Sequence, residues 1–234
     1  MKQEIILALE GRHCLYAVLS RLFFEVPDET LFAALRNGAM RSSCVMLDDA
    51  MREGVGDASR AWDRFARAAE DVRMEAAVRE FTRLFVGPGK LPVPPWESVF
   101  ATGERLLFQR STLEVREAFR REGVVAQGAP HVAEDSLATE LGFMAVLAER
   151  SRHAAEQDDA EELQRILRVQ AEFLEIHLLR WIGQFAEQMA HLSQVEGSEA
   201  VSDLYPAAAR LAYRACWEDV SLLSELSAAC SAAW

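Results

Sequence analysis

The chain has 234 residues, of which 37 are acidic and 25 are Lys or Arg, giving a formal net charge of −12. Nucleic acids and anionic lipids bind cationic faces, so this balance excludes broad binding to either and favours a basic partner. Half of the residues are hydrophobic, which excludes a disordered chain and predicts one compact domain over residues 1–234.

Membrane-spanning and disulfide-rich classes are also disfavoured. No apolar run reaches the roughly 20 residues that span a bilayer, so no stable membrane insertion is expected. The N-terminus carries an early acid, Glu4, and does not resemble a secretory signal. The four cysteines are far apart and form no Cys-x-x-Cys pair. We therefore expect a reduced, cytoplasmic protein.

Helical periodicity begins at the N-terminus. Apolar residues from Ile5 to Phe23 recur about every 3.6 residues, and Pro27 predicts that this helix ends before it. Asp28 is expected to cap a short helix through Leu35, which Asn37-Gly38 would close.

Two further helices are predicted before the pattern fails. One starts at Asp57, and the other runs from about Met74 to Phe85, each with apolar residues on one face. The stretch from Val86 to Gly103 then holds four of the seven prolines and three of the twelve glycines. It is therefore predicted to be irregular rather than helical.

Helical signals return in the second half of the chain. A helix is expected from about Glu104 to Glu122, and a second irregular stretch from Ala126 to Ala133. The next helix contains Leu137 to Ala148 on an apolar spacing. A long helical region from about Asp159 to Leu192 and a last helix starting near Ser202 complete the pattern.

The segments share one secondary-structure type. No strand periodicity and no internal repeat is evident. We predict an all-α fold, a single multi-helix domain of roughly eight to eleven helices with irregular loops at about 86–103 and 126–133.

Templates for catalysis and metal binding are absent. There is no His-Glu-x-x-His, no Gly-x-Ser-x-Gly and no dinucleotide-binding glycine pattern. Gly87-Pro-Gly-Lys90 has the wrong spacing for a phosphate loop, and Pro88 removes an N–H that such a loop uses. Glu10 and His13 form a single Glu-x-x-His, whereas a di-iron bundle needs two. We predict no catalytic residue, no metal and no cofactor.

Isolated histidines and cysteines are interpreted as structural residues. The five histidines share no ligand spacing, and His177 is expected to be a hydrogen-bonded residue at the edge of the core. Cys14 and Cys216 are expected to pack as small hydrophobic residues.

The first irregular stretch places rigid backbone next to recognition residues. Pro92 to Glu97 reads Pro-Val-Pro-Pro-Trp-Glu. Prolines lower the entropic cost of holding Trp96 and Glu97 in one pose, which is typical of a preorganised binding surface. The alternative is a structural loop that inserts Trp96 into the core.

Four motifs in the middle of the chain carry a family resemblance. They are Phe81–Gly89 (Phe-Thr-Arg-Leu-Phe-Val-Gly-Pro-Gly), Val93–Phe100 (Val-Pro-Pro-Trp-Glu-Ser-Val-Phe), Leu113–Phe119 and Glu134–Met144. Together they resemble the TorD/DmsD family of redox-enzyme maturation chaperones, most specifically through Pro-Pro-Trp-Glu-Ser. The resemblance implies the all-α fold of that family.

The second loop departs from the family pattern. Where the family has Glu-Pro-x-Asp-His, this chain has Val132-Ala-Glu-Asp-Ser136, so that only Asp135 is kept. Pro130 and His131 lie just upstream. Because the family uses this loop to engage its partner, the departure bears on partner identity rather than on the fold.

The resemblance implies a function without catalysis. Members are cytoplasmic chaperones that bind the catalytic subunit of a molybdopterin oxidoreductase, here called the client. Many bind its N-terminal twin-arginine signal, delay export until folding is complete and assist cofactor insertion. The alternative is a nitrate-reductase-type assembly chaperone that recognises the mature apo-enzyme without an export signal. A nucleotide-hydrolysing enzyme, the third hypothesis, would need a phosphate cradle that the sequence lacks.

A twin-arginine signal combines guanidinium groups with an apolar stretch, so its receptor needs carboxylates beside an apolar groove. Glu97 and Asp135 are expected to supply the carboxylates, and Phe81, Leu84, Phe85 and Trp96 the apolar lining. The full predicted set for partner binding is Phe81, Leu84, Phe85, Pro94, Pro95, Trp96, Glu97, Ser98, His131 and Asp135. The partner is the client's signal peptide, bound by a monomer or a homodimer.

Each of these residues also has a structural interpretation. Phe81, Leu84 and Phe85 have the spacing of a core-facing helix. Asp135 would cap a helix, and Glu97 would accept hydrogen bonds from loop amides.

Overall fold

The computed structural model describes residues 2–35, 39–51, 56–104, 106, 108–126, 133–192 and 202–233. Within these ranges the chain forms eleven α-helices and no strand, which confirms the predicted all-α class. The helices are α1 (Lys2–Phe24), α2 (Glu29–Leu35), α3 (Ala39–Asp49), α4 (Ala58–Asp71), α5 (Met74–Phe81), α6 (Glu97–Thr102), α7 (Arg110–Arg121), α8 (Leu137–Glu156), α9 (Ala160–Ile176), α10 (Ile182–Leu192) and α11 (Leu204–Ala233). A π-helical turn, η1 (Thr82–Val86), and a 3₁₀ turn, η2 (Leu178–Arg180), connect some of them. None of the described helices is both long and apolar enough to cross a bilayer.

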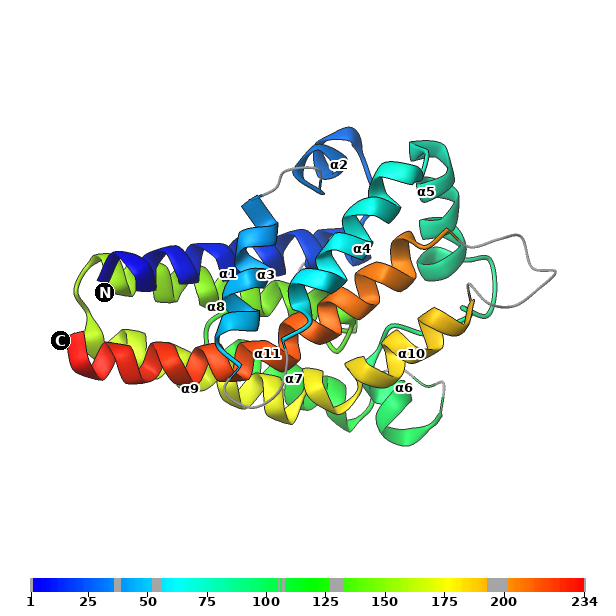
Figure 1. The fold of residues 1–234 in the computed structure, drawn as a ribbon. Helices are drawn as coiled ribbons and strands as arrows, with labels where there is room; N and C mark the ends of the chain where they lie inside the picture. Colours follow the sequence, from blue (N-terminus) through cyan, green and yellow to red (C-terminus); the bar gives the residue numbers. More distant parts are fainter. Residues whose placement is uncertain are drawn as a thin grey trace.

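Helices α1 and α8 lie side by side and form the centre of the fold (Figure 1). Ser20 on α1 donates a hydrogen bond to the Ala138 carbonyl on α8 at 2.7 Å. Gly142 permits this close approach, because a Cβ there would lie 3.0 Å from the Ser20 hydroxyl. Helix α9 packs on α8 and α11, and α11 also packs on α4 and α10. Buried apolar side chains from α1 to α11 form one contiguous core.

Local signals set the ends of the first helices. Helix α1 ends at Phe24, before Pro27, as predicted. The Asp28 carboxylate accepts a hydrogen bond from the Leu31 N–H at 2.7 Å, which confirms the predicted cap of α2. The predicted closing pair, Asn37-Gly38, lies outside the described residues.

The prediction that Val86 to Gly103 is irregular is wrong for the last part of this stretch. Glu97 to Thr102 form α6, which ends at Gly103 in the left-handed region with φ 72°. A proline pair stops a helix upstream but leaves the chain free to start one directly after it. For the second irregular stretch, residues 127–132 lie outside the described part of the chain.

Two other helices differ from the predictions. Helix α7 begins at Arg110 rather than near Glu104, because Gln109 is extended. Helix α3 was not predicted. Its apolar residues Met40, Cys44 and Leu47 are buried, but Arg and Ser residues follow Met40 and further apolar residues lie between Cys44 and Leu47, which obscures the periodicity.

The long helical region predicted from about Asp159 to Leu192 consists of two helices joined by a turn. Helix α9 ends at Ile176, and α10 begins at Ile182 after the η2 turn. His177 lies at the break, buried against Phe173 with ring centroids 4.8 Å apart. It is also hydrogen-bonded to Glu97, which confirms the predicted structural role.

The contact between α1 and α11 contains a buried ion pair. Arg12 donates two hydrogen bonds to Asp219, at 2.6 and 2.7 Å, and the Tyr16 hydroxyl donates to the same carboxylate at 2.7 Å. Cys216 is buried, as predicted. Cys14 is exposed, so its prediction as a core residue is wrong. It lies halfway between Arg12 and Tyr16 on α1, and residues two apart on a helix face different sides.

Two acidic side chains from other helices cap the start of α4. The Asp57 N–H donates to Glu218 at 2.8 Å, and the Ala58 N–H donates to Asp48 at 2.7 Å. Helix α4 therefore starts after Asp57, as predicted, although Asp57 itself makes no side-chain cap. Burial raises the pKa of Glu218 to about 7, and a hydrogen bond with Asp48 acts in the same direction.

This carboxyl makes the stability of the protein depend on pH. Folded Glu218 keeps its proton up to about pH 7, whereas unfolded Glu loses it near pH 4.3. The folded state therefore binds more protons between these values, and the free energy of unfolding falls as pH rises through them. We expect Glu218→Gln to reduce this pH-linked loss by about 2 kcal/mol in urea titrations at pH 5 and pH 8.

Glu187→Gln is the matched control, because Glu187 is exposed on α10. Its pH dependence should follow that of the unmodified protein. Identical curves for Glu218→Gln and the unmodified protein would contradict the assignment.

Candidate functional site

The two segments singled out in the sequence meet in the fold. Trp96 and Ser136 form an isolated antiparallel bridge. The Glu97 N–H donates to the Asp135 carbonyl at 2.9 Å, and the Leu137 N–H donates to the Pro95 carbonyl at 3.0 Å. The start of α6 is thereby attached to the start of α8.

Asp135 is fully buried, and its carboxylate accepts one hydrogen bond from a backbone N–H and one from a side chain. Its Oδ2 accepts from the Ser98 N–H at 2.9 Å, and its Oδ1 accepts from the Thr112 hydroxyl at 2.8 Å. It therefore caps α6 and anchors α7, while α8 is capped by its own Ser136. The next residue, Glu134, forms a bidentate ion pair with Arg116 of α7 at 2.7 and 2.9 Å.

Glu97 belongs to a second buried polar group. Its Oε2 lies 2.9 Å from Nδ1 of His177. Glu140 lies beside it and accepts a hydrogen bond from the Trp181 indole N–H at 3.3 Å. Burial raises the pKa of Glu140 well above its usual value, and the negative charges of Glu97 and Asp135 add to the effect. Burial therefore favours the protonated form of this carboxyl more than in an exposed glutamate.

The predicted apolar residues are mostly inside the core. Phe81 and Leu84 are buried. Phe81 packs on Phe85 and Tyr205, with ring centroids 5.5 and 6.4 Å away, and Phe85 packs edge-on against Phe23 at 5.7 Å.

The remaining predicted residues differ in exposure. Pro94, Pro95 and Ser98 are buried, and Trp96 is half-buried at the bridge. His131 lies outside the described residues. Within the described part of the predicted set, Trp96 and Phe85 are the side chains with accessible surface.

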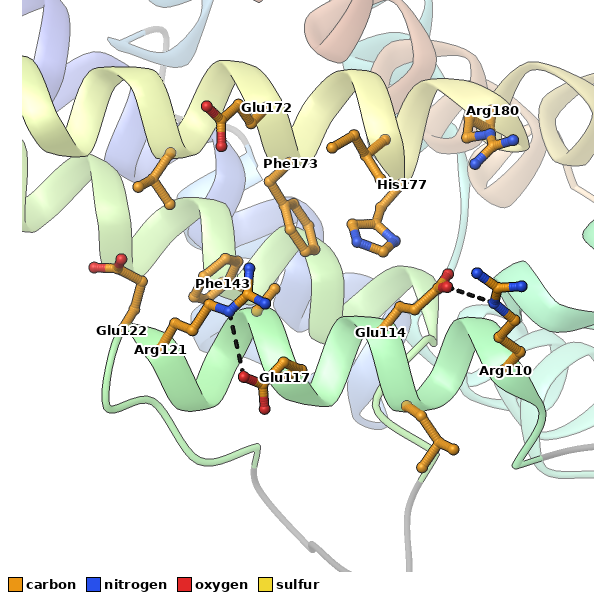
Figure 2. Close-up of a pocket in the computed structure, with 14 residues that line it drawn as sticks. Arg110, Glu114, Glu117, Arg121, Glu122, Phe143, Glu172, Phe173, His177 and Arg180 are labelled. Carbon is orange, nitrogen blue, oxygen red and sulfur yellow. Dashed lines mark hydrogen bonds and ion pairs between the residues drawn. The ribbon is translucent and has the colours of Figure 1, made fainter.

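A groove of about 530 Å³ lies between α7 and α9. Figure 2 shows side chains of both helices turned into it, with Phe143 of α8 behind them. Phe143, Phe173 and His177 are buried and form its floor. Leu113 on α7 and Ile176 on α9 line it with exposed fractions of 57% and 51%. The groove therefore presents apolar surface to solvent.

Charged side chains surround this apolar surface. Glu114 is paired with Arg110 at 2.7 Å, and Glu117 with Arg121 at 3.3 Å (Figure 2). A hydrogen bond from Arg120 to Glu117, aided by Arg121, lowers the pKa of Glu117 to about 2, so its carboxylate stays ionised. On the α9 side the groove is lined by Glu172.

A second cavity of about 340 Å³ extends the groove toward the buried network. Both cavities are lined by Arg110, Glu114 and Arg180, and the second also reaches Glu97 and Trp181. The residues that line these cavities come from helices far apart in the sequence. Leu113 and Ile176 are not among the predicted site residues, because periodicity does not reveal which apolar residues remain uncovered.

Comparisons with known proteins agree with the motifs. A family model described as "Nitrate reductase delta subunit" matches residues 48–187. The Vibrio cholerae protein named "Chaperone protein TorD" is 30% identical over 228 residues, 97% of this chain and 98% of that protein. This chain belongs to the TorD/DmsD family of redox-enzyme maturation chaperones. The TorD/DmsD proteins are chaperones, so the chain is not an enzyme.

Two further matches cover different lengths. The Salmonella typhimurium "Tat proofreading chaperone DmsD" is 34% identical over 113 residues, 48% of each chain. A solved structure from Archaeoglobus fulgidus, described as that of a redox enzyme maturation protein, is 19% identical with a TM-score of 0.47. It covers 87% of this chain and 91% of that one. No group of three or more His, Cys, Asp or Glu residues suited to a metal occurs in the described part of the TorD/DmsD-type chain.

The hydrogen bonds of Asp135 lead to a prediction about the free energy of unfolding. Asp135→Ala leaves the Ser98 N–H and the Thr112 hydroxyl without their buried acceptor, so we expect it to lower the free energy of unfolding by about 2–4 kcal/mol. Urea denaturation followed by circular dichroism measures the loss.

Asp159→Ala is the matched control. Asp159 also caps a helix, accepting from the Glu162 N–H at 3.0 Å, but at an exposed position. Its removal should cost about 1 kcal/mol. Equal losses in the two variants would contradict the central role of Asp135.

Proposed function

We propose that this protein is a cytoplasmic chaperone that binds the apo catalytic subunit of a molybdopterin oxidoreductase through its N-terminal twin-arginine signal. Binding delays export while the client folds and receives its cofactor. Membership of the TorD/DmsD family supports this role, as does the Salmonella relative's description as a Tat proofreading chaperone.

The groove between α7 and α9 is the observation that carries the proposal. A twin-arginine signal brings an apolar stretch next to guanidinium groups. Leu113 and Ile176 offer uncovered apolar surface, and Glu114, Glu117 and Glu172 offer carboxylates around it. The signal's apolar stretch would cover the former, and its arginines would pair with the latter.

Exchange of ion pairs makes this binding feasible. Glu114 is paired with Arg110, whose side chain is 91% exposed, and such pairs within a helix contribute only about 0.3–0.5 kcal/mol. A guanidinium from the client replaces the pair at little cost. The new pair is stronger than the old one where the bound peptide covers it from solvent.

In this proposal the predicted loop residues have different roles. Asp135 and Glu97 are satisfied by internal partners and act as positioning residues. They hold α6 and Trp96 in place, and the partly exposed Trp96 ring offers a further contact to the client. Phe81 and Leu84 support this region from the core.

A second candidate function is assembly of a nitrate-reductase-type enzyme through its mature part. The family model described as nitrate reductase delta subunit favours it. The two functions differ in what is bound, because only the first requires the signal peptide.

A peptide titration tests the first function. The probe is a synthetic twin-arginine leader from a molybdopterin oxidoreductase of the same organism, labelled for fluorescence anisotropy. Ile176→Asp places a charge in the apolar part of the groove and should weaken binding by at least about tenfold. A probe with both arginines replaced by lysine should also bind more weakly, because an ammonium cannot make bidentate pairs.

Leu7→Asp is the matched control. Leu7 lies on α1 with the same exposed fraction as Ile176, 51%, and lines neither cavity of the groove. Its affinity should equal that of the unmodified protein. An unchanged affinity in Ile176→Asp would remove the groove from the proposal. Absence of leader binding to the unmodified protein would favour the second function.

A further inference from the structure

A second surface with a different character lies along α11. Figure 1 shows α11 running between α4 and α10, and it packs on both. Tyr213 lies against Gly183 of α10, where a Cβ would come within 3.3 Å of the Tyr213 ring, and Arg214 reaches Asp57 before α4 at 3.4 Å. Arg210 and Trp217 lie three or four residues from Tyr213 and Arg214 along α11. They therefore form the ridge of α11 that neither neighbour covers.

Aromatic and guanidinium groups stack along this ridge. The Arg210 and Arg214 guanidinium carbons lie 5.8 and 5.6 Å from the Tyr213 ring centroid. The Trp217 ring lies 6.3 Å from that of Tyr213, and 49% of Trp217 is exposed. Trp, Tyr and Arg are the residues enriched at energetically dominant positions of protein interfaces.

A cavity of about 360 Å³ continues the ridge at its N-terminal end. Arg60 and Arg64 of α4 and Arg210 of α11 line it, together with Pro206 and small residues of α4 and α10. Arg60 pairs with Asp57 at 2.6 Å, and Arg64 with Asp203 at 2.9 Å. Both arginines are largely exposed, so these pairs are readily exchanged.

The local charge opposes that of the whole chain. The ridge and its cavity carry four arginines (Arg60, Arg64, Arg210 and Arg214) and three acids (Asp57, Glu187 and Asp203), a balance of +1. The chain as a whole carries −12. A surface with this balance and an exposed Trp is complementary to a polypeptide segment that carries carboxylates next to apolar side chains.

We propose that the α11 ridge, formed by Arg210, Tyr213, Arg214 and Trp217, together with the adjacent arginine-lined cavity, is a docking surface for a carboxylate-bearing segment of the client outside its leader. The inference rests on the proposed function for the identity of the client. A cationic leader suits the groove between α7 and α9, and an acidic segment suits the ridge between α4 and α10. The two surfaces share no lining residue, so that one client can contact both.

The test separates the two surfaces by using two probes. One is the leader peptide described above. The other is the apo catalytic subunit of the same oxidoreductase, purified without its leader. The double variant Arg210→Glu/Trp217→Ala should lower affinity for the leaderless subunit by at least about tenfold and leave leader affinity unchanged. Arg210→Glu alone, at an exposed position, should lower it by a smaller factor and shows the effect if the double variant does not fold.

Arg73→Glu is the matched control, because it makes the same charge change at an exposed residue before α5 that lines none of these cavities. It should bind both probes normally. Three results would overturn the proposal: no binding of the leaderless subunit to the unmodified protein, unchanged binding in the ridge variants, or a homodimer that these variants dissociate. In each of them the leader titration still reports independently on the proposed function.

Discussion

One buried carboxylate joins the segments from which the candidate site is built. Asp135 precedes α8, but its oxygens accept hydrogen bonds from the first turn of α6 and from Thr112 of α7. Such bonds to a charged acceptor are strong in a buried position, and each donor left without its acceptor is costly. The bridge that holds Trp96 and the α7 wall of the groove both depend on this residue.

The buried carboxylates have partners inside the protein, so recognition of a charged peptide is left to carboxylates on the surface. Glu97 is turned to His177, and burial together with acidic neighbours raises the pKa of Glu140 well above its usual value. The acids that face the groove are surface residues, among them Glu114 and Glu117 on α7. In the proposed binding mode, the bulk charge of −12 speeds encounter with a basic peptide, and the apolar floor with a few ionised side chains selects the peptide that stays bound.

Features encoded by neighbouring residues could be predicted from the sequence. Local patterns predict the all-α class and the cap at Asp28. The Pro-Pro-Trp-Glu-Ser motif indicates the family. Helix α6 was hidden because proline-rich composition masks a helix that begins after the last proline. The groove could not be predicted, because Leu113 and Ile176 meet only through the packing of α7, α8 and α9. Likewise, no pattern reveals that Asp135 serves another helix rather than its own.

The pairing of α1 with late parts of the chain has a consequence during synthesis. Ser20 meets Ala138 across 118 residues, and Arg12 meets Asp219 across 207. Helix α1 is therefore synthesised long before α8 and α11, and Arg12 stays hydrated until Asp219 has been made. Burial of that guanidinium is possible only once Asp219 is available, because an unpaired buried charge is strongly unfavourable. The contact of α1 with α11 is thus completed late, after the 207 residues that separate Arg12 from Asp219 have been added.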